Sequence, residues 1–128
     1  MSDWILDASA LLAYIHDEEG ADRVEDVLSG DVAISAVNLS EVISKLTDAR
    51  WSEDAIYEAI ELAAVPVADF DETAAFRAGL LWPATRQRGL SLGDRACLAL
   101  AAHYAAPALT ADRVWADLDT GIPVVLIR

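Results

Sequence analysis

The sequence predicts an α/β fold in which helices cover both faces of a parallel sheet. Short apolar runs that read as buried strands alternate with helical segments along the whole chain, and this alternation is typical of parallel sheets. The chain has 128 residues, of which 55% are hydrophobic, and that is enough for one folded domain with a sizeable core. We therefore expect a single domain over residues 1–128.

The expected elements follow one another without a linker, a repeat or a low-complexity tract. The strands are short apolar runs, expected at 4–7, 32–35, 65–70, 108–110 and 123–127. Helices are expected between them, at about 9–17, 21–29, 38–50, 53–64, 71–88 and 91–105. Pro83 lies inside one of these helical segments and should kink or split it, because proline removes a backbone donor and clashes with the preceding turn.

Apolar periodicity supports two of the helices. In the segment 38–50, one face is expected to carry Leu39, Val42, Ile43 and Leu46. In the segment 53–64, one side is expected to carry Ile56, Ile60 and Ala63, with acidic residues opposite. Residues 96–102 are apolar all round, so their helix should be buried on several sides.

Charge and cysteine content restrict the possible functions. The formal net charge is −13, the wrong sign for a protein that binds nucleic acid, unless bound cations or a basic partner offset it. Cys97 is the only cysteine, so an internal disulfide or a cysteine zinc site is excluded, and the thiol is expected to be buried. With no targeting segment and no apolar run that could span a membrane, we expect a cytoplasmic protein.

Four acidic residues are expected at one edge of the sheet. Asp7 ends the first strand, and Glu41 lies in the first turn of the helix after the second strand. Asp112 follows the fourth strand, and Asp94 opens the helix that leads back into it. These positions all fall at the carboxyl ends of the strands, where open α/β sheets bind their ligands.

A cluster of carboxylates needs cations to offset its repulsion, and oxygen ligands suit Mg²⁺ or Mn²⁺. Such a site can activate water and stabilise a leaving oxygen in phosphodiester hydrolysis. A plainer interpretation stays open for each acid. Asn38 with Glu41, and Ser91 with Asp94, have the spacing of helix caps. Asp7 and Asp112 could also serve helix termini.

Other acidic residues and the histidines are assigned plainer roles. Asp69 and Asp71 are expected to be a strand end and a helix cap, whereas Asp117 is a candidate accessory ligand. His16 and His103 are isolated in the sequence and have no zinc-enzyme spacing.

Four segments in order resemble the motifs of PIN-domain proteins, especially the VapC-type toxins of VapBC toxin–antitoxin modules. They are residues 4–12 (WILDASALL), 35–42 (SAVNLSEV), 90–101 (LSLGDRACLALA) and 109–115 (LTADRVW). The resemblance spans essentially the whole chain. It implies a three-layer α/β/α sandwich with a central parallel five-stranded sheet, and a ribonuclease that depends on Mg²⁺ or Mn²⁺.

The resemblance also implies roles for single residues and for partners. Asp7, Glu41, Asp94 and Asp112 would bind the metal or orient its water, and Ser9 and Thr110 would support them. The family usually forms homodimers, and a VapB-like antitoxin lays its C-terminal segment over the active site. The remaining antitoxin contact is expected on an exposed apolar surface near Trp51 or Trp82. Apart from the resemblance, the net charge of −13 means that RNA contact would rely on a few local cations, and Arg86, Arg88, Arg95 and Arg113 are the candidates. The alternative is that these arginines only pair with surface acids.

Three rivals deserve comparison. A receiver domain of two-component signalling would also bind Mg²⁺, but it needs a lysine near its last strand, and Lys45 is the only lysine. A haloacid-dehalogenase-like phosphatase needs an aspartate where Ser9 stands. A PIN fold kept only for binding is the third rival, and the complete set of four acids argues against it.

Overall fold

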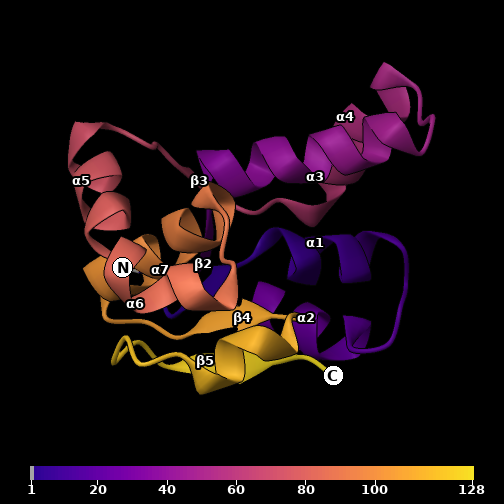
Figure 1. Ribbon diagram of the computed structural model, residues 1–128. Helices are drawn as coiled ribbons and strands as arrows, with labels where there is room; N and C mark the ends of the chain where they lie inside the picture. Colours follow the sequence, from indigo (N-terminus) through magenta and orange to yellow (C-terminus); the bar gives the residue numbers. More distant parts are fainter. Residues whose placement is uncertain (1) are drawn as a thin grey trace.

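The computed structural model describes residues 2–128. Five parallel strands form one sheet in the order β3-β2-β1-β4-β5 (Figure 1). The strands are β1 (Trp4–Leu6), β2 (Val32–Ser35), β3 (Val67–Ala68), β4 (Ala108–Thr110) and β5 (Val124–Leu126). This is the parallel five-stranded α/β fold that the sequence predicts.

Helices connect the strands as expected. They are α1 (Ala8–Ile15), α2 (Ala21–Leu28), α3 (Ala36–Asp48), α4 (Glu53–Ala63), α5 (Glu72–Leu80), α6 (Trp82–Thr85) and α7 (Leu92–Tyr104). Two short 3₁₀ helices complete the set, η1 (Arg86–Arg88) and η2 (Arg113–Asp117). Within residues 2–128, no helix combines the length and the apolar character needed to cross a bilayer.

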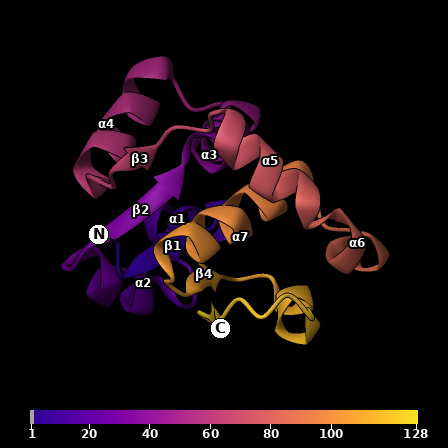
Figure 2. The same ribbon diagram turned by 90° about the vertical axis from the view of Figure 1, so that its left-hand side faces the viewer.

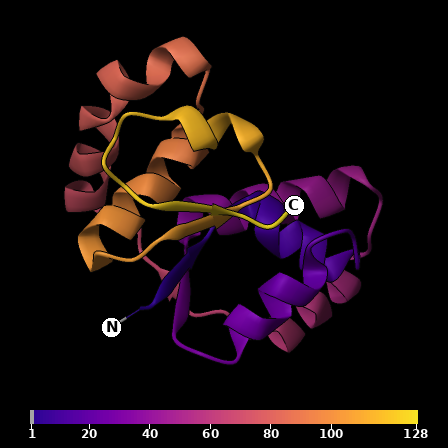
Figure 3. The same ribbon diagram turned by 90° about the horizontal axis from the view of Figure 1, so that it is seen from below.

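The strand register divides the core into two layers, because successive side chains on a strand point to opposite faces. Leu6 lies beside Ile34 and Leu109, and these side chains pack against α1, α2, α3 and α4. Ile5 lies beside Ala33 and Ala108, and these pack against α7 and Trp115. Figure 3 shows the two groups of helices on opposite sides of the strands, and Figure 2 shows α7 in front of β1 and β4.

Two expected elements differ in extent. The strand expected at 65–70 is only Val67–Ala68, because it lies at the sheet edge and pairs with β2 alone, and Pro66 has no N–H to donate. The helix expected at 71–88 is divided into α5, α6 and η1, with Pro83 in the first turn of α6. The split at Pro83 is therefore confirmed.

The buried face of α3 is rotated from the one predicted. Val42 and Leu46 are fully buried as expected, but Ile43 is 38% exposed. The third member of the buried row is Asn38, one turn before Val42. The prediction failed because apolar spacing gave no weight to a polar residue, whereas a buried amide is tolerated where it finds hydrogen-bond partners. Cys97 is buried, as expected.

Candidate functional site

The strand order reverses between β1 and β4, since the chain leaves β1 for β2 on one side and later adds β4 and β5 on the other. Crevices of this kind lie at the carboxyl ends of the strands and are the usual ligand sites of open α/β sheets. Asp7 directly follows β1, and Asp112 follows β4 by two residues. Asp94 lies in the first turn of α7, whose N-terminus faces the same crevice.

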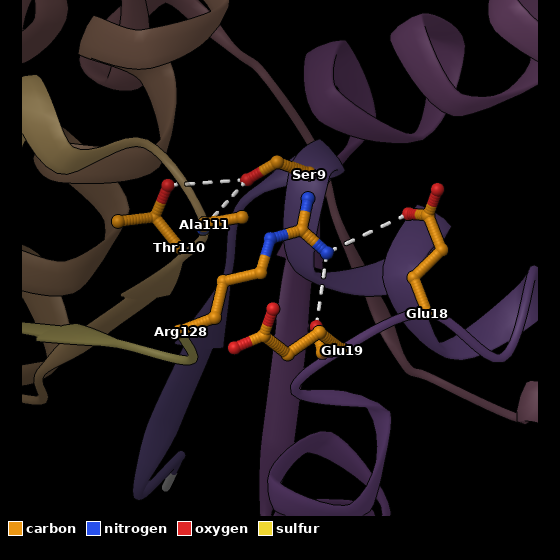
Figure 4. A network of polar contacts seen from close by, with 6 residues as sticks. All are labelled: Ser9, Glu18, Glu19, Thr110, Ala111 and Arg128. Carbon is orange, nitrogen blue, oxygen red and sulfur yellow. Dashed lines mark hydrogen bonds and ion pairs between the residues drawn. The ribbon is translucent and has the colours of Figure 1, made fainter.

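The Asp7 carboxylate is buried and held by two hydroxyl groups. Only 4% of Asp7 is exposed. Ser9 Oγ donates to Asp7 Oδ2 at 2.7 Å, and Thr110 Oγ1 donates to the same oxygen at 2.9 Å. Ser9 Oγ also accepts from the Ala111 N–H at 2.9 Å and lies 3.1 Å from Thr110 Oγ1 (Figure 4). These bonds tie the start of α1 to the end of β4.

Burial dominates the titration of Asp7. Removal from water raises the pKa of Asp7 from 3.8 to about 6, although the Ser9 and Thr110 hydroxyls work in the opposite direction. The negative charge of Asp94 raises the pKa further. A group with this pKa is ionised at neutral pH at a free-energy cost, and a nearby cation would relieve that cost.

Glu41 is positioned through Asn38. The Asn38 side-chain amide donates to Glu41 Oε1 and to the Gly93 carbonyl, both at 2.9 Å, and so links α3 to the first turn of α7. Because both partners are acceptors, they fix the amide nitrogen on this side. Asn38 Oδ1 is buried and has no hydrogen-bond partner within residues 2–128.

The cap expected at Asn38 is wrong. Helix α3 begins at Ala36, and Ser35 caps it by accepting from the Val37 N–H at 3.2 Å. Glu41 therefore lies in the second turn rather than the first. The glycine at residue 93 leaves room for the Glu41 carboxylate, which a Cβ there would overlap unless the Glu41 side chain moved.

Asp94 caps its helix and also faces the other acids. The Ser91 N–H donates to Asp94 Oδ2 at 2.9 Å, and the Asp94 N–H donates to Ser91 Oγ at 3.2 Å, which is the capping box expected from the sequence. Burial raises the pKa of Asp94, the bonds from Ser91 oppose the shift, and the charge of Asp112 adds to it. Capping and a functional role are therefore compatible at this residue.

Asp112 is exposed and begins η2, a helix that the sequence did not predict. Its Oδ1 accepts from the Val114 N–H at 3.0 Å. Its own N–H donates to Thr110 Oγ1 at 3.0 Å. The Thr110 hydroxyl thus binds the Asp7 carboxylate and the backbone of Asp112 together.

The four carboxylates share one neighbourhood and a common mode of attachment. Beneath them, burial raises the pKa of the Cys97 thiol well above its usual value, and the charges of Asp7, Asp94 and Glu41 add to the shift. Each carboxylate accepts its hydrogen bonds through a single oxygen. The donors are Ser9 and Thr110 for Asp7, Asn38 for Glu41, the Ser91 N–H for Asp94, and the Val114 N–H for Asp112. The second oxygen accepts no hydrogen bond from another side chain among residues 2–128.

The four carboxylates do not form a closed cage. Among the described residues, no three aspartate, glutamate, histidine or cysteine side chains are close enough together to enclose a metal ion. All-oxygen donors nevertheless fit Mg²⁺ or Mn²⁺, and Mg²⁺ commonly binds through one or two carboxylates while keeping its waters. Convergence of all four acids on one metal stays a prediction.

The remaining candidates lie around the crevice. Asp117 is exposed and pairs with Arg88 at 3.7 Å, and it makes no hydrogen bond or ion pair to the four acids within residues 2–128. Arg95 donates to the Ala78 carbonyl at 3.2 Å, and its guanidinium lies over the Trp82 ring. Arg86 and Arg113 are exposed on η1 and η2. Asp71 caps α5 through the Ala74 N–H, as predicted.

Arg128 lies next to this region, after β5. Its guanidinium donates to the Glu19 carbonyl at 2.9 Å and pairs with Glu18 at 3.7 Å (Figure 4). These contacts fasten the end of β5 to the loop between α1 and α2.

Sequence reasoning misread the role of Asn38, which it took for a helix cap, and missed Gly93. The signal was present for both, since an asparagine three residues before a candidate ligand and a glycine directly before another are unusual inside helices. Their roles depend on the approach of α3 to α7, which no local pattern reports.

A separate apolar cavity of about 490 Å³ lies between α3 and α4. Its lining residues are Leu39, Ile43, Thr47, Trp51, Glu53, Ile56, Tyr57 and Ile60. The rotation of α3 explains it, because Leu39 and Ile43 face this cavity rather than the core. Glu53 is the one acidic residue in this lining, whereas Asp54, Glu58 and Glu61 are exposed elsewhere on α4.

Comparison with known proteins identifies a family. The sequence profile of the PIN domain matches residues 4–121. No curated protein sequence matches the chain. Similar folds occur among solved structures, including VapBC2 from Rickettsia felis bound to a promoter DNA fragment, at 17% identity and a TM-score of 0.74 over 96% of this chain and 97% of that one.

Two structures from Mycobacterium tuberculosis are also similar. VapBC-5, a toxin–antitoxin system, shares 25% identity with a TM-score of 0.62 over 98% of both chains. VapC20, a toxin that cleaves the sarcin–ricin loop, shares 18% identity with a TM-score of 0.69 over 88% of this chain and 93% of that one. At 17% and 18% identity, the similarity to VapBC2 and to VapC20 shows only that the fold is shared.

Proposed function

The chain belongs to the PIN domain family, and on that premise we propose that it is a divalent-metal-dependent endoribonuclease and the toxin half of a type II toxin–antitoxin pair. One observation carries the proposal. The Asp7 carboxylate is buried at the crevice, is held through one oxygen by Ser9 and Thr110, and lies within the electrostatic reach of Asp94. A structural aspartate gains nothing from such burial without a compensating charge.

The four acids would hold Mg²⁺ or Mn²⁺ between them. Asp7 and Asp94 are the central pair, and Glu41 and Asp112 would contact the ion or its waters. When bound, the metal would lower the pKa of a water molecule and offset the charge of the phosphate. Asp117 would affect the site only indirectly, through its position on η2.

The chain's own residues prepare the crevice. Ser9 and Thr110 fix the rotamer of Asp7, so its second oxygen is available to a ligand. Asn38 does the same for Glu41, and the capping box does so for Asp94. Preorganised carboxylates of this kind lose little entropy when a charged substrate binds.

RNA contact must rely on local cations, because the net charge is −13. Arg86 and Arg88 lie on η1, Arg95 lies on α7 and Arg113 lies on η2. They would contact phosphates while the metal offsets the carboxylates.

A VapB-like antitoxin is the proposed partner, in line with the toxin–antitoxin complexes of similar fold. The cavity between α3 and α4 includes Trp51, where the sequence suggested an exposed apolar surface. Glu53 in its lining could pair with a basic residue of an amphipathic segment. An arginine of that segment could reach the crevice and pair with the carboxylates in place of the metal. We also propose a homodimer that acts as one domain per chain in the cytoplasm.

The test is a cleavage assay on partner-free protein. Structured and single-stranded RNAs should be cut in Mg²⁺ or Mn²⁺, should survive in EDTA, and should be cut again when the metal is restored. Asp94→Asn purified in parallel controls for contaminating ribonuclease. Undiminished cutting in EDTA would overturn the metal-dependent mechanism.

A further inference from the structure

A tryptophan and an arginine form a stacked pair beside the acidic crevice. Trp82 opens α6 and is 50% exposed, although indole is the largest apolar side chain. The Arg95 guanidinium lies over its ring at 5.3 Å from the centroid. Arg95 directly follows Asp94 in the first turns of α7, so the pair is connected by one helix to the proposed metal site.

The surroundings hold this pair rigidly. Arg95 donates to the Ala78 carbonyl of α5 at 3.2 Å, which fixes the guanidinium. Thr85 is fully buried, and its hydroxyl donates to the Leu81 carbonyl at 2.8 Å, which fixes the single turn of α6. A fixed cation–π pair presents a flat surface at little entropic cost.

Positive charge gathers around the same surface. Arg86 and Arg88 follow α6 directly on η1, and Arg88 pairs with Asp117 of η2. Figure 2 shows α6 at the end of α5, with the yellow turn of η2 below it. The segment 82–88 therefore bridges the beginning of α7 and the turn that follows Asp112. An exposed aromatic ring among arginines is the combination that binds single-stranded nucleic acid, through base stacking and phosphate contact.

We infer that Trp82 and Arg95 form a base-stacking platform that positions single-stranded RNA across the acidic crevice, with Arg86 and Arg88 on the adjacent phosphates. A base next to the cleaved phosphate stacks on the indole. The ring carries affinity that a chain of net charge −13 cannot obtain from its overall field. Stacking tolerates any base but favours purines, because their larger ring overlaps the indole more. This inference rests on the proposed ribonuclease function and deepens it.

Binding is measured separately from cleavage. Fluorescently labelled oligo(A) and oligo(U) are titrated with the full chain in Ca²⁺, and gels run afterwards verify that the oligonucleotides stay intact. The variants are Trp82→Phe, which keeps an aromatic face, and Trp82→Leu, which keeps only apolar bulk. Phe76→Leu is the matched control, since Phe76 is also an aromatic residue, is 70% exposed, and belongs to α5 rather than to the segment 82–88.

Trp82→Leu should weaken binding about tenfold, with a smaller loss for Trp82→Phe and none for Phe76→Leu. The preference for oligo(A) over oligo(U) should narrow in Trp82→Leu. RNA should quench the intrinsic fluorescence of the wild type, and Trp82→Phe should lose most of that quenching, because Trp115 is buried and Trp4 and Trp51 lie on β1 and at the α3–α4 cavity, outside the proposed platform.

Four outcomes would overturn the inference. They are no RNA binding by the wild type, unchanged affinity in Trp82→Leu, an equal loss in Phe76→Leu, and a loss that accompanies a change of oligomeric state in light scattering. Failure of the proposed function would look different. Trp82-dependent binding without cleavage in Mg²⁺ would refute the ribonuclease and keep the platform, whereas cleavage with Trp82-independent binding would refute the platform alone.

Discussion

Gly93 and Glu41 lie so close together that any side chain at residue 93 would overlap the Glu41 carboxylate. The two residues belong to different helices, α7 and α3, and Asn38 bridges them by binding Glu41 Oε1 and the Gly93 carbonyl. Because residue 93 has no side chain, the Glu41 carboxylate can occupy this space. Adding a side chain at residue 93 should displace the carboxylate and so tests directly what Glu41 does.

Gly93→Ala should displace the Glu41 carboxylate and lower RNA cleavage by about 10- to 100-fold, the range seen when the support of a metal ligand is lost. The free energy of unfolding should change by less than about 1 kcal/mol, because the Glu41 side chain can rotate away and alanine favours the helix. Cleavage rates and denaturant titrations measure the two effects.

Gly79→Ala is the matched control. Gly79 lies within α5, and a Cβ there would meet nothing within 4 Å. This change should stabilise the protein by about 0.5–1 kcal/mol and leave cleavage unaltered. If Gly93→Ala cleaved RNA at the wild-type rate, the position of Glu41 would not matter to the reaction.

The carboxylates should differ in importance according to their place at the crevice. Asp7→Asn, Glu41→Gln, Asp94→Asn and Asp112→Asn should each lower the cleavage rate by about 100-fold or more, the scale of losing one electrostatic contact to the reacting group. Asp117→Asn should have an intermediate effect and Asp119→Asn a mild one.

Asp71→Asn separates capping from catalysis. Asp71 is the N-cap of α5 and accepts from the Ala74 N–H, whereas Asp94 accepts from the Ser91 N–H in the capping box of α7. The substitution should leave cleavage unchanged. Normal cleavage by Asp94→Asn would mean that Asp94 serves its helix alone, since the asparagine side-chain oxygen can still accept from the Ser91 N–H.

The raised pKa of Asp7 predicts how the stability of the metal-free protein changes with pH. Folding raises the pKa from 3.8 to about 6, so the folded state disfavours the ionised form. The destabilisation is complete above pH 6, is relieved as the pH falls from 6 to 3.8, and is absent below 3.8. The shift corresponds to roughly 3 kcal/mol.

Asp7→Asn should therefore be more stable than the wild type by up to about 3 kcal/mol at pH 8 in EDTA, and the difference should shrink towards pH 4. Urea titrations at several pH values measure it. Mg²⁺ should stabilise the wild type more at pH 8 than at pH 5, because it binds the ionised form. A stability difference that stayed constant with pH would indicate that Asp7 has no raised pKa.

Much of the fold could be predicted because it depends on local patterns. Each strand is a short apolar run, the capping box at Ser91 and Asp94 has a fixed spacing, and Pro83 interrupts a helix wherever it occurs. The placement of acids after strands followed from the parallel topology alone. These inferences need no knowledge of which helix touches which.

The remainder depended on contacts between elements. Asn38 can be buried because its amide donates to the Gly93 carbonyl of α7, and the sequence of α3 does not indicate that hydrogen-bond partner. The same packing turns Ile43 outward to the cavity beside α4. Helix η2 begins at Asp112, whose side chain accepts from the Val114 N–H. The Asp112 backbone is itself held by the Thr110 hydroxyl, a contact that depends on where β4 ends.

Antitoxin binding should depend on the cavity between α3 and α4. Tyr57 and Leu62 form a matched pair on α4, since they are 67% and 76% exposed, but only Tyr57 lines the cavity. Tyr57→Ala should weaken binding of the proposed VapB-like antitoxin by about 30-fold, as expected for an aromatic side chain that becomes buried in an interface. Leu62→Ala should change the affinity less than about threefold. Calorimetry gives both values, and inhibition of RNA cleavage should follow the same order. Equal effects of the two substitutions would mean that the partner binds elsewhere on the protein.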